Sequence, residues 1–284
     1  MTETWTIQRV LAWTGDYFKK KGLDAPRLTA ELLLAKALGC DRVRLYMDLD
    51  RPLNKDELAG YRGLVERRAG GEPTFYLLGS KEFYARPFKV DARVLTPRPE
   101  TELVTEVALE KLPKDATGAV LDLCTGSGCI GLTIAAERPG MRVVAVDASP
   151  DALAVARENA AALGVAARVE LLQGDLWAPV AGRTFQLIVS NPPYVETAVI
   201  PTLRPEVRRE PKMALDGGQD GLDLLRKIVS GAPAHLEASS WLVLEIGEGQ
   251  GGALMGLFTG ASLTDPAIRK DLGGLDRIAL ARRP

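Results

Sequence analysis

Apolar residues recur at helical spacing through the first part of the chain. Three stripes are present: Ile7, Val10, Leu11, Thr14 and Phe18; Leu28, Leu32, Ala35 and Leu38; and Leu58, Tyr61, Leu64 and Val65. The second stripe follows Pro26, which favours a helix start, and it ends at Gly39, which favours a helix stop. The spacing predicts a small helical bundle over residues 1–78.

The pattern changes over residues 79–95, where Phe83, Phe88 and Val90 lie in a stretch with extended character. A turn near Arg86-Pro87 makes this stretch a predicted β-hairpin that links two parts of the chain. Pro97 and Pro99 then exclude a helix locally, so that the next helix is expected to begin near Glu100 and to reach Leu112.

From residue 96 to residue 284 the pattern predicts an α/β domain. Short apolar strands are expected at residues 119–123, 142–146, 169–173, 185–190 and 241–246, with helices at 129–136, 151–163 and 222–235. Such alternation is typical of a mostly parallel sheet with helices on both faces. Residues 276–282 predict one more strand, which we expect to be antiparallel.

Charge and composition exclude several classes of protein. The 284 residues contain 36 Lys and Arg against 37 Asp and Glu, a net charge of -1, so bulk positive charge is not available to bind nucleic acid, and no direct nucleic-acid partner is expected. The sequence has no apolar run of about 18 residues, so no membrane span is expected, and the N-terminus does not resemble a secretory signal. Three cysteines fit a reducing compartment, so a cytoplasmic location is expected.

A glycine-rich loop follows the first predicted strand of the α/β domain. Gly126, Gly128 and Gly131 fit the pattern G-x-G-x-x-G, in which glycine lets a ligand approach the backbone closely. Asp147 ends the next strand, where its carboxylate is suited to accept hydrogen bonds from ribose hydroxyls. This loop predicts a nucleoside-containing cofactor, and by itself leaves a dinucleotide and S-adenosylmethionine both open.

Other polar residues favour S-adenosylmethionine. Asp122 precedes the loop, where a carboxylate suits a cationic amino group better than a pyrophosphate. Asp175 follows the third strand, where it is suited to meet an adenine amino group. Asn191-Pro192-Pro193-Tyr194 follows the fourth strand. Because the carboxyl ends of parallel strands meet at one edge of a sheet, these residues are expected in one crevice.

The Asn-Pro-Pro-Tyr segment suits methylation of a planar nitrogen, whose delocalised lone pair makes it a poor nucleophile. The Asn191 side-chain oxygen and the Pro192 carbonyl can each accept one N–H of an NH2 group, which orients it and favours the positive charge that develops. Pro192 and Pro193 stiffen the backbone, and Tyr194 offers a flat wall for a planar group. No histidine base is needed, which matters because His235 is the only histidine.

No metal site is expected. Cys124 and Cys129 are five residues apart at a strand-to-helix turn, without a nearby histidine or a further cysteine. Cys124 is better interpreted as a small residue in a crowded turn.

Three segments together resemble the protein-(glutamine-N5) methyltransferases of the HemK/PrmC family: residues 96–102, residues 122–128 and residues 191–194. Residues 210–222 are a further similar stretch, and the resemblance covers most of the chain from about Thr74 to the end. It implies a seven-stranded Rossmann-like methyltransferase domain (96–284) behind a β-hairpin linker (79–95) and a helical bundle (1–78) that recognises the substrate. The implied reaction is methyl transfer from S-adenosylmethionine to the glutamine side chain of the Gly-Gly-Gln motif of bacterial-type class I peptide chain release factors.

The resemblance also implies roles for individual residues. Asn191, Pro192, Pro193 and Tyr194 are expected to hold the glutamine, with Asn191, Pro192 and Tyr194 catalytic, and Arg98, Pro99 and Glu100 are expected in the substrate wall. The cofactor is expected to contact Asp122, Cys124, Thr125, Gly126, Ser127, Gly128, Asp147, Asp175, Leu176 and Asn191. Relatives can carry an aromatic residue where this chain has Leu176.

Three alternatives remain at this point. A sister enzyme that methylates a glutamine of a ribosomal protein shares nearly every motif. An adenine-N6 methyltransferase uses the same pair of acceptors, although the balanced charge disfavours it. A cofactor-binding module without activity is disfavoured because it has no need of Asn191-Pro192.

Overall fold

The computed structural model describes residues 4–284. These residues form two compact units. One contains the described residues up to Ser80 together with Arg204–Arg209, and the other contains Lys81–Leu203 and Glu210–Pro284. Within residues 4–284, no helix is long and apolar enough to cross a membrane.

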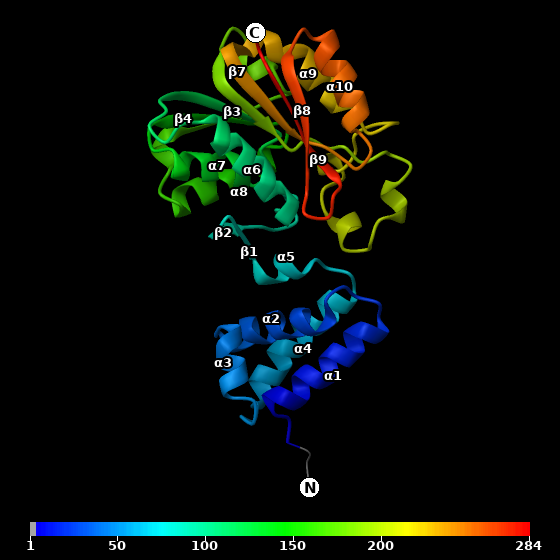
Figure 1. Cartoon of the computed structure of the whole chain (residues 1–284). Helices are drawn as coiled ribbons and strands as arrows, with labels where there is room; N and C mark the ends of the chain where they lie inside the picture. Colours follow the sequence, from blue (N-terminus) through cyan, green and yellow to red (C-terminus); the bar gives the residue numbers. More distant parts are fainter. Residues whose placement is uncertain (1–3) are drawn as a thin grey trace. The chain divides into compact units, whose positions relative to one another are not determined.

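The first unit is built from helices, as its stripes predict (Figure 1). They are α1 (Ile7–Lys20), α2 (Pro26–Leu38), α3 (Arg42–Met47), α4 (Lys55–Ala69) and α5 (Thr74–Leu78). Local signals set several ends: Asn54 and Glu57 form a capping box before α4, and Gly39 ends α2 with a left-handed φ of 63°. The short helices α3 and α5 were not predicted, because neither is long enough to show a periodic stripe.

The core of this unit corrects one expectation. In α2 the buried apolar residues are Ala30, Leu33, Leu34 and Ala35, whereas Leu28 is 41% exposed. Both α1 and α4 contact α2, so this helix buries a broader and rotated face than one stripe indicates.

The β-hairpin consists of β1 (Ser80–Phe83) and β2 (Arg86–Lys89). Tyr84 and Ala85 both have positive φ, at 51° and 56°, as a two-residue hairpin turn requires. The turn therefore lies just before Arg86-Pro87. Phe83 and Phe88 are fully buried, meet edge to face at 5.9 Å and belong to the core of the second unit. All but the first residue of the predicted hairpin linker thus belongs to the α/β unit.

The second unit contains a seven-stranded sheet of the order β5-β4-β3-β6-β7-β9-β8, in agreement with the predicted Rossmann-like α/β class. Strands β3 to β7 are parallel, and β9 runs antiparallel to both β7 and β8. The strands are β3 (Gly118–Leu123), β4 (Met141–Asp147), β5 (Val169–Gln173), β6 (Phe185–Ser190), β7 (Leu236–Glu245), β8 (Thr264–Lys270) and β9 (Asp276–Arg282).

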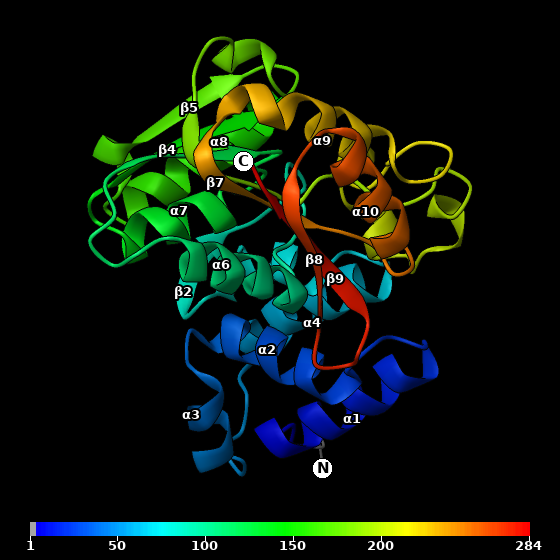
Figure 2. The same cartoon turned by 45° about the horizontal axis from the view of Figure 1, so that its top comes forward.

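Helices cover both faces of the sheet (Figure 2). They are α6 (Pro99–Lys111), α7 (Cys129–Glu137) and α8 (Pro150–Ala162) on one face, and α9 (Asp223–His235) and α10 (Gly251–Gly260) on the other. Short 3-10 turns occur at Ala166–Arg168, Ala178–Val180, Ile200–Thr202, Val207–Arg209 and Lys212–Ala214. The glycine-rich α10 and the edge strand β8, which has no fully buried residue, were not predicted.

The strand order places a switch point beside β3. The chain runs outward from β3 through β4 to β5, then returns to β6 on the other side of β3. Connections on the two sides of such a point leave a crevice beyond the carboxyl ends of the strands. The loops after β3, β4, β5 and β6 all open into this crevice.

Candidate functional site

A pocket of the second unit lies at this edge of the sheet. Its wall comes from seven places along the chain: Arg93, Val94, Leu95, Pro97, Arg98 and Thr101; Cys124, Thr125, Gly126, Ser127, Cys129 and Ile130; Val146, Asp147, Ala148, Ser149 and Ala152; Gly174, Asp175 and Leu176; Asn191 and Pro193; Pro211, Met213 and Ala214; and Leu224. Residues from four strand ends therefore share one cavity, as the sequence predicts.

Ten of the predicted site residues line the pocket and six do not. Those that line it are Arg98, Cys124, Thr125, Gly126, Ser127, Asp147, Asp175, Leu176, Asn191 and Pro193. Pro99 and Glu100 are exposed on the first turn of α6. Asp122, Gly128, Pro192 and Tyr194 are not among the residues that line it.

The glycine loop after β3 makes one wall. Cys124 and Gly126 have φ of 57° and 55°, and Gly128 has φ of 83° where α7 begins. A Cβ at Gly126 would meet no atom within 4 Å, whereas one at Gly128 would lie 2.7 Å from Leu132 Cδ1. Gly126 thus keeps its backbone open to the pocket, and Gly128 allows the close packing of loop on helix.

Asp122 holds the loop from beneath. Its Oδ2 accepts hydrogen bonds from Thr125 Oγ1 at 2.6 Å and from Gly131 N at 3.0 Å. The side chain is 1% exposed, and burial raises the pKa of this carboxyl to about 7. Asp122 does not line the pocket: Oδ2 is bound to the loop and to α7, whereas Oδ1 is buried and has no hydrogen-bond partner within residues 4–284.

Asp147 lines the pocket with both carboxylate oxygens held in place. Oδ2 accepts from Gly126 N at 2.8 Å, and Oδ1 accepts from Ser149 N at 2.9 Å. Burial raises the pKa of Asp147 despite these hydrogen bonds. Each oxygen keeps a lone pair, so a preoriented carboxylate is available for a pair of hydroxyl donors.

Leu176 forms the apolar wall near the end of β5. It is buried and has a positive φ of 45°, which is uncommon for a residue with a branched side chain. Asp175 beside it is exposed. The left-handed backbone at Leu176, like that at Cys124, belongs to the pocket wall, where strained conformations tend to concentrate.

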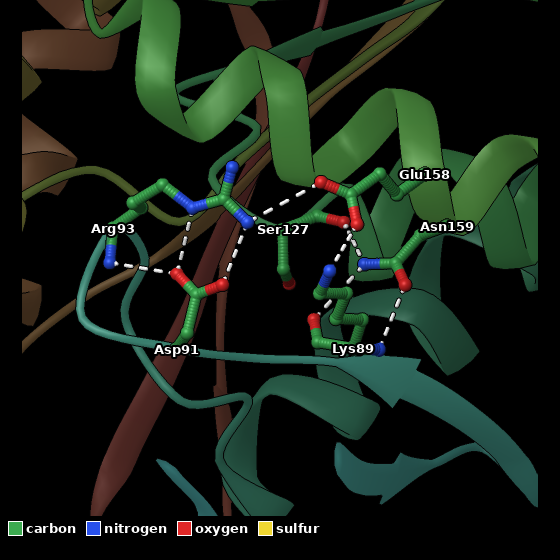
Figure 3. A network of polar contacts seen from close by, with 6 residues as sticks. All are labelled: Lys89, Asp91, Arg93, Ser127, Glu158 and Asn159. Atoms are coloured by element: carbon green, nitrogen blue, oxygen red, sulfur yellow. Dashed lines mark hydrogen bonds and ion pairs between the residues drawn. The ribbon is translucent and has the colours of Figure 1, made fainter. Parts of the chain in front are cut away.

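A buried asparagine that the sequence analysis missed connects the hairpin to the glycine loop (Figure 3). Asn159 Nδ2 donates to Ser127 O at 2.9 Å and to Lys89 O at 3.1 Å, while its Oδ1 accepts from Lys89 N at 2.7 Å. Around it, Arg93 pairs with Asp91 and Glu158, and Lys89 also pairs with Glu158. The position of the loop is therefore fixed by the hairpin as well as by the sheet.

The Asn-Pro-Pro-Tyr segment is anchored by a buried glutamate. Asn191 Nδ2 donates to Thr101 Oγ1 at 3.1 Å, and Thr101 Oγ1 donates to Glu245 Oε2 at 2.7 Å. Tyr194 donates its hydroxyl to Glu245 Oε1 at 3.0 Å. Glu245 is 1% exposed, and burial raises its pKa to about 7. Tyr194 therefore packs toward the sheet and does not supply the pocket wall that we expected.

The stretch after residue 214 braces the same segment. Val195 N donates to Leu215 O at 2.9 Å, and Gly217 N donates to Val195 O at 2.8 Å. A Cβ at Gly217 would lie 2.8 Å from Tyr194 Cα, so only glycine allows this approach. Gln250 Nε2 completes the support with a hydrogen bond of 3.1 Å to Tyr194 O.

Arg98 lines the pocket and forms an ion pair. Its guanidinium pairs with Glu210, whose Oε1 also accepts from Thr96 N at 3.2 Å. Burial raises the pKa of Glu210, although Arg98 opposes that change. The pair ties the segment before α6 to the segment after residue 209, which are two of the four family-like stretches of the sequence.

His235 lies away from the pocket. Its Nδ1 is 2.9 Å from Arg183 O, and its ring stacks on Trp177 with centroids 4.6 Å apart. These contacts hold the ring against Trp177 and Arg183, so His235 is not available as a base in the pocket, in keeping with a reaction that needs none.

Thr101, Asn159, Glu245 and Gln250 were not predicted to support the site. Glu245 had one detectable signal, because a carboxylate stood inside a strand that was otherwise apolar. Thr101 lies within the family-like residues 96–102 but was given no role there, and Asn159 and Gln250 carried no signal.

Two family models and many full-length relatives match this chain. Residues 9–79 match the PrmC N-terminal domain, and residues 99–209 match the methyltransferase small domain. The release factor glutamine methyltransferase of Geobacter sulfurreducens is 48% identical over 99% of this chain and 98% of its own length. That of Caulobacter vibrioides is 42% identical over 97% and 96%.

Solved structures show the same fold at low identity. The T. thermophilus 16S rRNA N2 G1207 methyltransferase, in complex with AdoMet and guanosine, has a TM-score of 0.52 and 18% identity, over 72% of this chain and 50% of its own. The full-length relatives are decisive about kinship. The chain is a methyltransferase that belongs to the release factor glutamine methyltransferase family.

Proposed function

We propose that this protein transfers a methyl group from S-adenosylmethionine to the side-chain nitrogen, N5, of the glutamine in the Gly-Gly-Gln motif of class I release factors. The observation that carries the proposal is the position of Asn191. It lines the same pocket as Gly126 and Asp147, so a planar amide and a nucleoside-containing methyl donor can meet in one cavity. Release factors act in the cytoplasm, where the reaction is then expected.

The residues present fit S-adenosylmethionine. The open backbone at Gly126 leaves room for the amino acid portion, since no atom lies within 4 Å of a Cβ placed there. The two preoriented oxygens of Asp147 suit the ribose hydroxyls, and buried Leu176 suits one face of the adenine. When bound, this cofactor supplies an electrophilic methyl group on a positively charged sulfur.

The chain's own part is to hold the glutamine nitrogen. Asn191 Oδ1 accepts one N–H, and we assign the second acceptor to the carbonyl of Pro192, between two residues that line the pocket. Two oxygen acceptors orient the NH2 group and stabilise the positive charge that appears when the new N–C bond forms. One N–H proton then leaves to water, so no histidine is required.

Two surrounding parts have accompanying roles in this proposal. Arg98, held by Glu210, forms a polar side of the substrate wall. The helical unit, with its core of apolar residues and its separate family match, recognises the body of the release factor. The names of the full-length relatives support this choice of partner.

The test uses purified protein, S-adenosylmethionine with a labelled methyl group, and a release factor. Mass spectrometry of the Gly-Gly-Gln peptide is expected to find one added methyl group on the glutamine, and none when that glutamine is changed to alanine. A release factor that stays unmodified while a ribosomal protein is labelled would contradict the proposal in favour of the sister activity. Labelled nucleic acid would instead indicate adenine methylation.

A further inference from the structure

Asn191 is held by a chain of side chains that ends at a buried carboxylate. We propose that Thr101 and Glu245 are positioning residues, which fix the Asn191 amide so that its oxygen, and not its nitrogen, faces the substrate NH2 group. This inference rests on the proposed function, since it concerns how the same site presents its acceptor. Thr101 comes from α6, Asn191 follows β6 and Glu245 ends β7.

The donor and acceptor in each of these hydrogen bonds follow from the number of hydrogens available. Thr101 Oγ1 lies 2.7 Å from Glu245 Oε2 and 3.1 Å from Asn191 Nδ2. A hydroxyl has one hydrogen to donate, and an ionised carboxylate can only accept. Thr101 must therefore donate to Glu245 and accept from Asn191, which commits Nδ2 to Thr101 and leaves Oδ1 for the substrate.

The second oxygen of Glu245 is also used. Tyr194 donates its hydroxyl to Oε1 at 3.0 Å, so that each carboxylate oxygen receives one hydroxyl donor. Both ends of the Asn-Pro-Pro-Tyr segment are thus tied to a single group, Asn191 through Thr101 and Tyr194 directly. The carboxylate keeps the first and last residues of the motif in a fixed relation.

A buried carboxylate is a poor means of stabilising a sheet. Glu245 is 1% exposed and lies between apolar strands, where removing a charge from water is costly. An apolar residue would pack there at less cost. A role in setting the polarity of the Asn191 amide gives the charge a purpose that packing alone does not.

Protonation of Glu245 is expected to reverse the direction of the hydrogen bonds that link Glu245, Thr101 and Asn191. A proton on Oε2 would be donated to Thr101, whose own hydrogen would then turn to Asn191 and favour an amide with Oδ1 toward Thr101. Burial raises the pKa of Glu245 to about 7. The charged and titratable groups around it are Glu100 of α6, Cys129 of α7, Tyr194 after β6 and Arg277 of β9.

The turnover rate is expected to depend on the ionisation of Glu245. Glu100 raises and Arg277 lowers the pKa of Glu245, with burial the larger cause. Because the ionised form is the one that presents Oδ1, the turnover rate is expected to fall as pH drops through about 7. This fall in the turnover rate at low pH should be absent in Glu245→Gln, whose neutral amide does not titrate. It should persist in Asp122→Asn.

The central experiment compares three substitutions in α6. Thr101→Val removes the hydroxyl at nearly constant volume, and Thr101→Ser keeps it. Thr105→Val is the matched control, because Thr105 is fully buried one turn further along α6 and its Oγ1 has no hydrogen-bond partner within residues 4–284. At pH 8.5, kcat and KM for the release factor and the Kd of S-adenosylmethionine are measured for each variant.

Thr101→Val is expected to lower kcat about 10- to 100-fold, because a misoriented acceptor affects the transition state, with little change in cofactor Kd. Thr101→Ser should restore most of that loss, and Thr105→Val should match the wild type in kcat. A wild-type kcat in Thr101→Val, or an equal loss in the Ser variant, would overturn the inference.

A second readout does not depend on turnover. In nuclear magnetic resonance spectra of the free protein, the Asn191 side-chain NH2 signal is assigned by its loss in Asn191→Ala. Its protons should exchange slowly with water in the wild type and in Thr101→Ser, and quickly in Thr101→Val. If the wild type does not methylate a release factor, the proposed function fails, whereas this exchange pattern still decides the orientation of the amide; fast exchange in the wild type overturns it.

Discussion

Tyr194 donates its hydroxyl to Glu245 Oε1 across 3.0 Å, and this contact joins the last residue of the Asn-Pro-Pro-Tyr segment to the end of β7. From the sequence, we expected Tyr194 to face the substrate. Instead, burial and the neighbouring carboxylate raise the pKa of its phenol, as expected of a hydroxyl that acts only as a hydrogen-bond donor. The motif thus combines one residue that faces the pocket with another that anchors the turn.

Tyr194→Phe is expected to lower the free energy of unfolding by about 1–3 kcal/mol, because it leaves a buried carboxylate oxygen without its donor. Urea unfolding measures the change. Tyr84→Phe is a suitable control, since within residues 4–284 the Tyr84 hydroxyl makes no hydrogen bond, and its unfolding free energy should change little. Equal effects of the two substitutions would show that the Glu245 contact contributes nothing.

Asn191→Ala is expected to slow methyl transfer by about 100-fold or more, because it removes an acceptor aimed at the reacting nitrogen. Cofactor affinity should stay close to that of the wild type, since Asp147, Gly126 and Leu176 provide the remaining wall. Single-turnover kinetics measure transfer, and calorimetry measures binding. Loss of cofactor binding would instead assign Asn191 to the cofactor.

Gly126→Ala is expected to weaken binding of S-adenosylmethionine about 10-fold or more, because its Cβ would enter the space that the cofactor needs. Gly164→Ala is the matched control. Both glycines have positive φ, 55° and 69°, and neither has an atom within 4 Å of a Cβ position, but only Gly126 lines the pocket.

Thermal unfolding should therefore show a similar loss of stability in both variants, on the order of 1–2 kcal/mol, because alanine is unfavourable in a left-handed backbone conformation. Calorimetry should show that only Gly126→Ala weakens binding of S-adenosylmethionine. Equal cofactor affinities in the two variants would exclude close approach of the cofactor at Gly126.

The stability of the second unit is expected to depend on pH through Asp122. Burial raises its pKa from 3.8 to about 7, so the folded state holds this proton more tightly than the unfolded state does. Stability then declines as pH rises from 3.8 towards 7, and the penalty is fully present above 7.

Asp122→Asn removes that titration while Glu245 remains in both proteins. Its unfolding free energy relative to the wild type should therefore increase between pH 5 and pH 8, by roughly 2–3 kcal/mol. Urea titrations at both pH values measure this difference. Parallel pH curves for the two proteins would show that Asp122 is not the group responsible.

Local signals were enough to predict the main elements of the fold. The three bundle helices, the hairpin and the alternation after residue 118 follow from apolar spacing and from glycine and proline positions, because these depend on neighbours in the sequence. The edge strand β8 and the short helices α3 and α5 lack such patterns. The face of α2 was only partly predicted, since α1 and α4 together determine what it buries.

The site divides in the same way. Strand ends at one edge of a parallel sheet converge, so the convergence of Gly126, Asp147, Asp175 and Asn191 could be predicted from the sequence alone. By contrast, the support of the loop by Asp122 and the contact of Tyr194 with Glu245 depend on long-range packing and could be seen only in the folded chain. Contacts such as Thr101 with Asn191 join residues 90 positions apart, and no local pattern encodes which of two buried polar groups will be neighbours.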